Sequence, residues 1–255
     1  MTEDISELAD RLAKASFGRT AIAPLSEQAP GLDVDAGYAI QGLAREAAGP
    51  LAGWKLGVTS RAEQAQAGAG AGAPVRGFLA SANALDLGKP LASDELIQPR
   101  AQPEIVFVIG RDLSGPAVTA ADVLAATASV AAGIEILDSR LDGQVTVPDL
   151  IADNASAGRF LVGSPVPLAG IDLRLTGVVF EHNGQVVGTA AGAAALGHPA
   201  AAVAWLVRSL AAAGEGVAAD QVVLSGGLTA AVPVRPRDVV VASIDRLGTV
   251  ELAVA

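Results

Sequence analysis

The stretch Gln98-Pro99-Arg100-Ala101-Gln102-Pro103-Glu104-Ile105-Val106-Phe107-Val108-Ile109-Gly110 decides the fold that we expect. Its second half is a run of β-branched and aromatic residues that ends at a glycine, which is typical of a buried strand. Gln102 and Glu104 lead into this run two residues apart, so their side chains share one face of the strand. A carboxylate that enters an apolar strand is unfavourable unless something compensates it, and a bound cation is one such compensation. We therefore predict half of a metal site here.

A second apolar strand with an embedded carboxylate follows at Gly133–Leu137, where Glu135 lies between two isoleucines. Oxygen ligands of this kind suit Mg²⁺ or Mn²⁺. The chain has no cysteine and only two histidines, which argues against the common zinc sites. The alternative is that each glutamate pairs with an arginine at a strand end. That alternative is favoured for either glutamate alone, but the two together with Gln102 make the metal site an equal candidate.

Composition limits the kind of protein that this chain can be. With 255 residues, 51% of them hydrophobic, it can form one large domain or a domain with a small appendage. The formal net charge of −10 argues against nucleic-acid partners and an anionic membrane surface. No segment approaches the roughly 20 apolar residues of a spanning helix, and residues 1–14 do not resemble a signal peptide. We expect a soluble, cytoplasmic protein without nucleic-acid or membrane partners.

We expect residues 1–50 to form an N-terminal helical segment and residues 51–255 to form a mixed β domain that carries the candidate site. Helical periodicity predicts helices over 4–15 and 33–48 with an extended connector over 17–32, and later helices over 119–132 and 198–213. Residues 61–73 read as a short helix that gives way to a mobile Gly/Ala loop. His182-Asn183-Gly184 indicates a hairpin turn. Strands outnumber helices without a βαβ rhythm, so we predict an α+β fold around a rolled or sandwiched mixed sheet.

Other polar residues are weaker candidates when taken alone. Lys55, between Trp54 and Leu56, would be desolvated on a buried strand, which lowers a lysine pKa and suits proton transfer. An edge-strand lysine with its ammonium in water is the slightly favoured alternative. The run Asp153–Ser156 could bind a carboxylate or simply form a turn. The turn at Ser225–Gly227 offers backbone N–H groups to an anion, although most such turns have no ligand.

Several co-linear segments resemble the family of 2-hydroxypenta-2,4-dienoate (2-keto-4-pentenoate) hydratases and 4-oxalocrotonate decarboxylases, within the fumarylacetoacetate hydrolase superfamily. The resemblance covers almost the whole chain and lies in residues 35–41, 53–60, 99–113, 133–136, 153–160, 196–199 and 225–234. It implies a fold of the fumarylacetoacetate hydrolase type. It also implies a Mg²⁺- or Mn²⁺-dependent lyase that acts on 2-oxo or 2-hydroxy dienoic acids from meta-cleavage of aromatic compounds.

The resemblance also implies roles for particular residues. The metal ligands of the family fall on Gln102, Glu104 and Glu135. The catalytic positions fall on Lys55, Asp153 and Ser156, and candidate substrate-binding positions on Ser60, Arg159 and Thr229. The substrate is a small 2-oxo acid, and a homo-oligomer is expected by analogy with the family, with association to a related lyase as a further possibility.

Two departures from the family pattern bear on the reaction. The first ligand position, usually glutamate, is Gln102, which removes one negative charge and predicts weaker metal binding and a more electrophilic ion; a metal-free or altered site is the alternative. Hydratases of the family tend to carry an acid near position 75, where this chain has Val75. The resemblance therefore favours a decarboxylase, with a hydratase second. A divergent C–C hydrolase or enolate enzyme of the same fold is a third candidate, and a non-catalytic partner subunit is a fourth.

Overall fold

The computed structural model describes residues 4–61, 63–64 and 73–255. Most of the loop expected over 61–73 lies outside the described residues. The helices are α1 (Ile5–Gly18), α2 (Leu25–Gln28), α3 (Val34–Ala47), α5 (Ala120–Ala126), α6 (Val147–Ala152) and α7 (Pro199–Ala211), with short 3-10 turns at Ser81–Asn83, Ser93–Glu95, Asn154–Ser156 and Gly192–Ala194. Within these residues no helix is long and apolar enough to cross a membrane.

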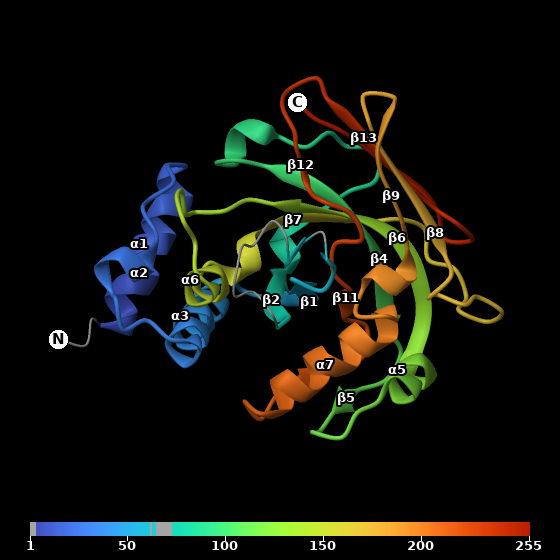
Figure 1. The fold of residues 1–255 in the computed structure, drawn as a ribbon, viewed down its shortest axis with the longest axis horizontal. Helices are drawn as coiled ribbons and strands as arrows, with labels where there is room; N and C mark the ends of the chain where they lie inside the picture. Colours follow the sequence, from blue (N-terminus) through green and yellow to red (C-terminus); the bar gives the residue numbers. More distant parts are fainter. Residues whose placement is uncertain (1–3, 62, 65–72) are drawn as a thin grey trace.

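The body of the molecule is a curled mixed sheet with the strand order β2-β1-β11-β4-β6-β7-β3, to which β12 adds along β4 (Figure 1). These strands are β1 (Leu51–Gly57), β2 (Val75–Ala80), β3 (Ala84–Leu85), β4 (Arg100–Ile109), β6 (Thr127–Leu137), β7 (Ala157–Val162), β11 (Val222–Leu224) and β12 (Val232–Pro233). β1 runs parallel to β11, whereas β4 is antiparallel to both β11 and β6. The predicted mixed α+β sheet fold is confirmed.

A second sheet has the strand order β14-β13-β8-β9. Its strands are β8 (Gly177–His182), β9 (Gln185–Ala191), β13 (Val239–Ile244) and β14 (Gly248–Ala253), while β5 (Leu113–Ser114) and β10 (Gly216–Val217) form a small separate pair. The β8–β9 hairpin turns at Asn183 and Gly184, as predicted. The second sheet contacts β4 and β6, so one face of these two strands is covered by apolar side chains.

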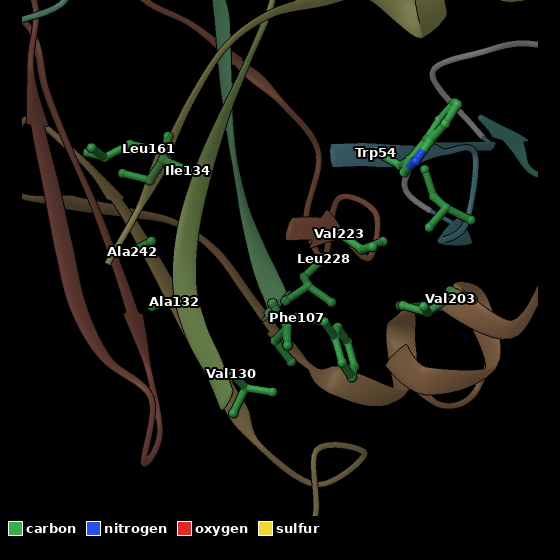
Figure 2. Packing of buried hydrophobic residues seen from close by; sticks show 14 of the residues in the cluster. Trp54, Phe107, Val130, Ala132, Ile134, Leu161, Val203, Val223, Leu228 and Ala242 are labelled. Carbon is green, nitrogen blue, oxygen red and sulfur yellow. The ribbon is translucent and has the colours of Figure 1, made fainter. Parts of the chain in front are cut away.

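The large hydrophobic core lies between the main sheet, the second sheet and α7. Phe107 on β4, Val223 on β11 and Val203 on α7 all belong to this core and are fully buried (Figure 2). Ala242 of β13 joins it from the second sheet. Because this core uses only one face of β4, the opposite face of the strand is available for other side chains.

The helix predicted over 119–132 is wrong in its second half. Thr119 caps α5 in a capping box with Asp122, but the helix ends at Ala126 and β6 begins at Thr127. Residues 127–132 pair with β4, from Thr127 opposite Ile109 to Ala132 opposite Ile105. An alanine-rich run has no strong periodicity of its own, so pairing across the sheet decides its conformation.

The N-terminal helices pack on one side of the main sheet, next to α6 (Figure 1). Asp33 is the N-cap of α3, whereas the stretch predicted as an extended connector contains the end of α1 and the short helix α2. Leu8, Leu12 and Ile40 form a small core with Leu141 and Ala152 from the body of the chain. The segment 1–50 is therefore attached through shared apolar packing, and its treatment as a separate unit stays a proposal.

Candidate functional site

Three oxygen-bearing side chains meet on the face of β4 and β6 that points away from the large core. Gln102 lies directly opposite Glu135 in the antiparallel register, and Glu104 is two residues along the same face of β4. The exposed fractions are 1% for Gln102 and 0% for both glutamates. The structure thus brings the three predicted metal ligands together in the interior of the protein.

A hydrogen-bond network ties these three side chains together. Gln102 Nε2 donates to Glu135 Oε2 at 2.9 Å and to Glu104 Oε1 at 3.2 Å. Gly226 N donates to Glu104 Oε2 at 2.6 Å, so the glycine turn after β11 offers its N–H to an internal carboxylate. The predicted anion-binding turn therefore already has a partner within the protein.

Lys55 reaches the same point from β1. Its Nζ lies 2.9 Å from Glu135 Oε1 and donates to the carbonyl oxygen of Ala155 at 2.9 Å. The side chain is 1% exposed, so the alternative of an edge-strand lysine with its ammonium in water is wrong. Gly77 on β2 leaves the space that Lys55 uses, because a Cβ there would lie 3.1 Å from Lys55 Cδ.

The charges of this cluster shift the pKa values in a direction that burial alone does not predict. Burial lowers the pKa of Lys55, but the negative charges of Glu135 and Glu104 outweigh burial and raise that pKa above its usual value of 10.5. The expected lowered lysine pKa is therefore wrong for this arrangement of side chains. Burial, and then the charge of Glu135, raises the pKa of Glu104 well above its usual value.

The chemistry of this set fits a hard divalent cation. Gln102 Oε1 is buried and has no hydrogen-bond partner among the described residues. Two buried carboxylates and an unpartnered amide oxygen are the donors that Mg²⁺ and similar ions prefer. The described residues contain no group of three or more His, Cys, Asp and Glu side chains that could hold a metal. This agrees with a candidate site of two glutamates in which the Gln102 amide is the third ligand.

A cavity of about 450 Å³ opens above this cluster. Lys55 and Gln102 form part of its wall, whereas Glu104 and Glu135 lie behind them. Among the other residues in the wall are Val58, Glu63, Val75, Gln98, Arg100, Ser139, Leu150 and Ser156. The cavity is large enough for a small organic acid and presents the predicted Ser156 and Val75 to it.

Glu63 is a carboxyl group in the cavity wall that sequence reasoning missed. Its Oε2 accepts hydrogen bonds from Thr59 N at 2.8 Å and Ser60 N at 3.1 Å, and Ser60 Oγ accepts from Glu63 N at 3.2 Å. Burial raises the pKa of Glu63 against the opposing effect of the Lys55 charge. The spacing Ser-x-x-Glu, which marks a capping box, was the available signal.

Asp153 supports the site from behind instead of facing the cavity. Its carboxylate forms an ion pair with Arg140 and accepts hydrogen bonds from Ser139 and Ser156 Oγ at 2.9 and 3.4 Å. Ser139 and Ser156 line the cavity, but Asp153 does not. Its side chain therefore positions the polar loop of the cavity.

The three predicted substrate-binding residues lie outside the cavity wall. Ser60 caps the turn that carries Glu63. The side chain of Arg159 lies 3.4 Å from Glu95 and donates to Asn83, at a partly exposed position. Thr229 Oγ1 donates to the carbonyl oxygen of Ala230. Arg100, which sequence reasoning did not select as a site residue, lines the cavity instead.

Comparison with known proteins identifies relatives over the full length of the chain. No family model matches. The 2-keto-4-pentenoate hydratase of Burkholderia vietnamiensis strain G4 is 39% identical over 258 residues, covering 98% of each chain. The structure of 4-oxalocrotonate decarboxylase from Pseudomonas putida G7, complexed with magnesium and adipate, is 36% identical with a TM-score of 0.94, covering 100% of this chain and 98% of that one. The same decarboxylase with calcium and acetate gives a TM-score of 0.91.

A more distant structure shares the fold alone. Fumarylpyruvate hydrolase from Pseudomonas aeruginosa, solved with Mn²⁺ and pyruvate, is 15% identical with a TM-score of 0.65, covering 79% of this chain and 88% of that one. The curled mixed sheet is therefore common to proteins whose sequences have diverged far from this chain.

Proposed function

The chain belongs to the family of 2-keto-4-pentenoate hydratases and 4-oxalocrotonate decarboxylases, and from this premise we propose that it is a divalent-metal-dependent decarboxylase of a 4-oxalocrotonate-type 2-oxo acid. The observation that carries the proposal is the meeting of Gln102, Glu104 and Glu135 with Lys55 beside one cavity, whose wall Gln102 and Lys55 help to form. Magnesium is the first candidate ion and manganese the second, because both prefer oxygen ligands.

The residues that would hold the ion are Glu104 and Glu135 through their carboxylates and Gln102 through Oε1. When bound, a divalent cation draws electron density from the 2-oxo group of the substrate and so stabilises negative charge that develops on it. Gly226 N–H fixes Glu104, and Lys55 fixes Glu135, so both carboxylates are positioned before a ligand arrives.

Lys55 supplies a protonated cation beside the reacting group. Its raised pKa keeps the ammonium charged at neutral pH. An ammonium has three N–H donors, and the contacts with Glu135 and Ala155 account for two of them. We propose that the remaining N–H donates a hydrogen bond to a substrate oxygen. The same N–H holds the proton that the dienol product needs. Ser156, held by Asp153, would orient the substrate in the same cavity.

The apolar part of the cavity favours loss of CO₂ over addition of water. Val58, Val75 and Leu150 line it, and position 75 carries no acid that could guide a water molecule. Loss of CO₂ requires an electron sink and no water nucleophile. The substrate carboxylate that leaves as CO₂ is dehydrated next to these apolar side chains, which disfavours the charged group. The neutral CO₂ product loses little by the absence of water.

Hydration of a 2-hydroxydienoic acid is the second candidate function, and Glu63 is the observation that supports it. Its carboxyl group lines the same cavity, and burial raises its pKa toward the range of a general acid or base. In this version Glu63 takes over the task of the acid that is missing at position 75.

The two reactions are separated by their products. The purified chain is incubated with Mg²⁺ and either a 4-oxalocrotonate or a 2-hydroxypenta-2,4-dienoate, while CO₂ release and 4-hydroxy-2-oxo acid formation are followed. We expect CO₂ release, with little effect of Glu63→Gln. Water addition that Glu63→Gln abolishes would establish the second candidate, and the absence of both products would contradict the assignment to either reaction. Should a related lyase restore turnover, the chain acts as a partner subunit.

Assembly and location also stay proposals. We propose a homo-oligomer, with association to a related lyase as a further arrangement, and a cytoplasmic location; both rest on the family resemblance and the composition of the chain. Gel filtration with light scattering measures the first directly.

A further inference from the structure

The side chains of Gln102 and Lys55 stand between the two buried carboxylates and the cavity. Gln102 lines the cavity wall, while Glu104 and Glu135 lie behind it with 0% exposure. The Gln102 amide also lies directly against Gly227, where a Cβ would come within 2.5 Å of Gln102 Oε1. A cation that enters from the cavity therefore meets this amide before it meets the carboxylates.

The orientation of the amide is dictated by its neighbours. Its Nε2 donates to Glu135 Oε2 at 2.9 Å and to Glu104 Oε1 at 3.2 Å. The Glu135 carboxylate is ion-paired with Lys55 and only accepts hydrogen bonds, so the amide beside it presents its NH₂ group to the two glutamates. Its carbonyl oxygen is then left buried without a hydrogen-bond partner among the described residues.

Gln102 thus lies between the cavity and the two glutamates, and its NH₂ group occupies the space between them where a cation would bind. We propose that the Gln102 amide is an internal plug: its NH₂ group holds Glu104 and Glu135 together in the metal-free protein, and a divalent cation binds only when this amide turns its carbonyl oxygen toward the carboxylates. The exchange of Nε2 for Oε1 is a rotation about one side-chain bond and requires no movement of the backbone. The inference deepens the proposed metal-dependent function and rests on it.

A glutamate at this position would behave in the opposite way. It offers no N–H between the carboxylates and adds a third negative charge, so the metal-free site repels itself and the cation gains a ligand. The plug therefore stabilises the empty site and weakens cation binding, and both effects come from the same two hydrogen bonds.

The test compares Gln102→Glu and Gln102→Met with the parent chain, with Gln144→Glu as a matched control. Gln144 lies at the exposed part of the same cavity wall, so its change adds the same charge away from the carboxylates. The full-length proteins are stripped with EDTA and titrated with Mn²⁺, and free Mn²⁺ is counted by its paramagnetic resonance signal. The melting temperature is measured for each protein with and without Mn²⁺.

We expect Gln102→Glu to bind Mn²⁺ at least about tenfold more tightly than the parent chain, and Gln102→Met to bind it more weakly. Without metal, both variants should melt about 4–10 °C below the parent chain, while Gln144→Glu stays close to it. Equal melting of the parent chain and Gln102→Met without metal would overturn the plug. So would a gain in Mn²⁺ affinity no larger than that of Gln144→Glu.

The failure of this inference can be told from the failure of the proposed function. If neither the parent chain nor any variant binds Mn²⁺, the proposed metal-dependent function is contradicted, and so is the proposal that Gln102 controls cation binding. The order of melting temperatures without metal still decides whether the amide holds the carboxylates together.

Discussion

The two faces of β4 differ in the kind of side chain that they bury. On one face Ile105, Phe107 and Ile109 are fully buried as members of the large hydrophobic core. On the other face Gln102 and Glu104 are buried to the same extent, yet they contact charged and polar atoms. Burial thus serves apolar packing on one face of the strand, whereas on the other face it serves polar contacts at Gln102 and Glu104 and apolar packing at Val106.

This difference teaches how the protein divides stability from function. Burial of apolar side chains lowers the free energy of the folded state, whereas burial of carboxylates raises it unless hydrogen bonds and opposite charges compensate. Lys55, Gly226 and the Gln102 amide supply that compensation. Substitutions on the two faces should therefore affect different measurements.

The largest effect is expected for Lys55→Met on the polar side. The change removes the cation beside the reacting group, so kcat/KM should fall about 100- to 10,000-fold. Circular dichroism and gel filtration first establish that the variant is folded. A fall in kcat/KM of less than about fivefold would show that Lys55 is not part of the reaction.

On the apolar side, Phe107→Ala should reduce the free energy of unfolding by about 3–5 kcal/mol, because it leaves a cavity in the core. Urea denaturation measures this loss. Activity per folded molecule should stay near that of the parent chain at a temperature where the variant is folded. A comparable loss of activity would mean that the two faces are not independent.

The pH dependence of stability sharpens the comparison. The pKa of Glu104 is raised well above 4.5 in the folded protein, so the folded state holds this proton more tightly than the unfolded state does. In metal-free protein the contribution of Glu104 to stability is therefore greatest below pH 4.5 and is lost as the pH rises through the folded pKa. Urea denaturation in EDTA at several pH values should show a smaller decline for Glu104→Gln than for the parent chain. If the free energy of unfolding of Glu104→Gln falls with pH as steeply as that of the parent chain, titratable groups other than Glu104 cause the pH dependence.

The smallest effect is expected for Arg159→Ala. Arg159 is at the surface of β7, where it lies 3.4 Å from the exposed Glu95 and outside the cavity. A partly exposed ion pair of this kind contributes about 0–1 kcal/mol. Both KM and the free energy of unfolding should remain close to the parent values. A marked rise in KM would restore the substrate-binding role that the resemblance predicted.

The part of the site that could be predicted is the part that local sequence encodes. Gln102, Glu104 and Glu135 stand out because each interrupts an apolar strand, and the glycine turn at Gly226 is visible from its composition. Their meeting depends on the antiparallel register of β4 and β6, which no local pattern specifies. The family resemblance supplied that information.

The features that the sequence left unpredicted have a common physical origin in contacts between distant segments. Asp153 forms an ion pair with Arg140 and does not line the cavity, so its catalytic role stays a prediction. The sign of the Lys55 pKa shift depends on Glu135, 80 positions further along the chain. The residues after Ala126 become a strand because β4 pairs with them. Propensity and spacing cannot anticipate such contacts.

The register between β4 and β6 has a consequence for how this protein can change over evolutionary time. In the connection between β4 and β6, residues 115–117 lie between β5 and α5 and can change in number without displacing a ligand, since β4 and β6 are fixed by their own pairing. A one-residue insertion between Gln102 and Glu104 would instead turn the residues on one side of it to the opposite face, so these two side chains would no longer share a face. Variation in length should therefore accumulate between the two strands and be absent within them.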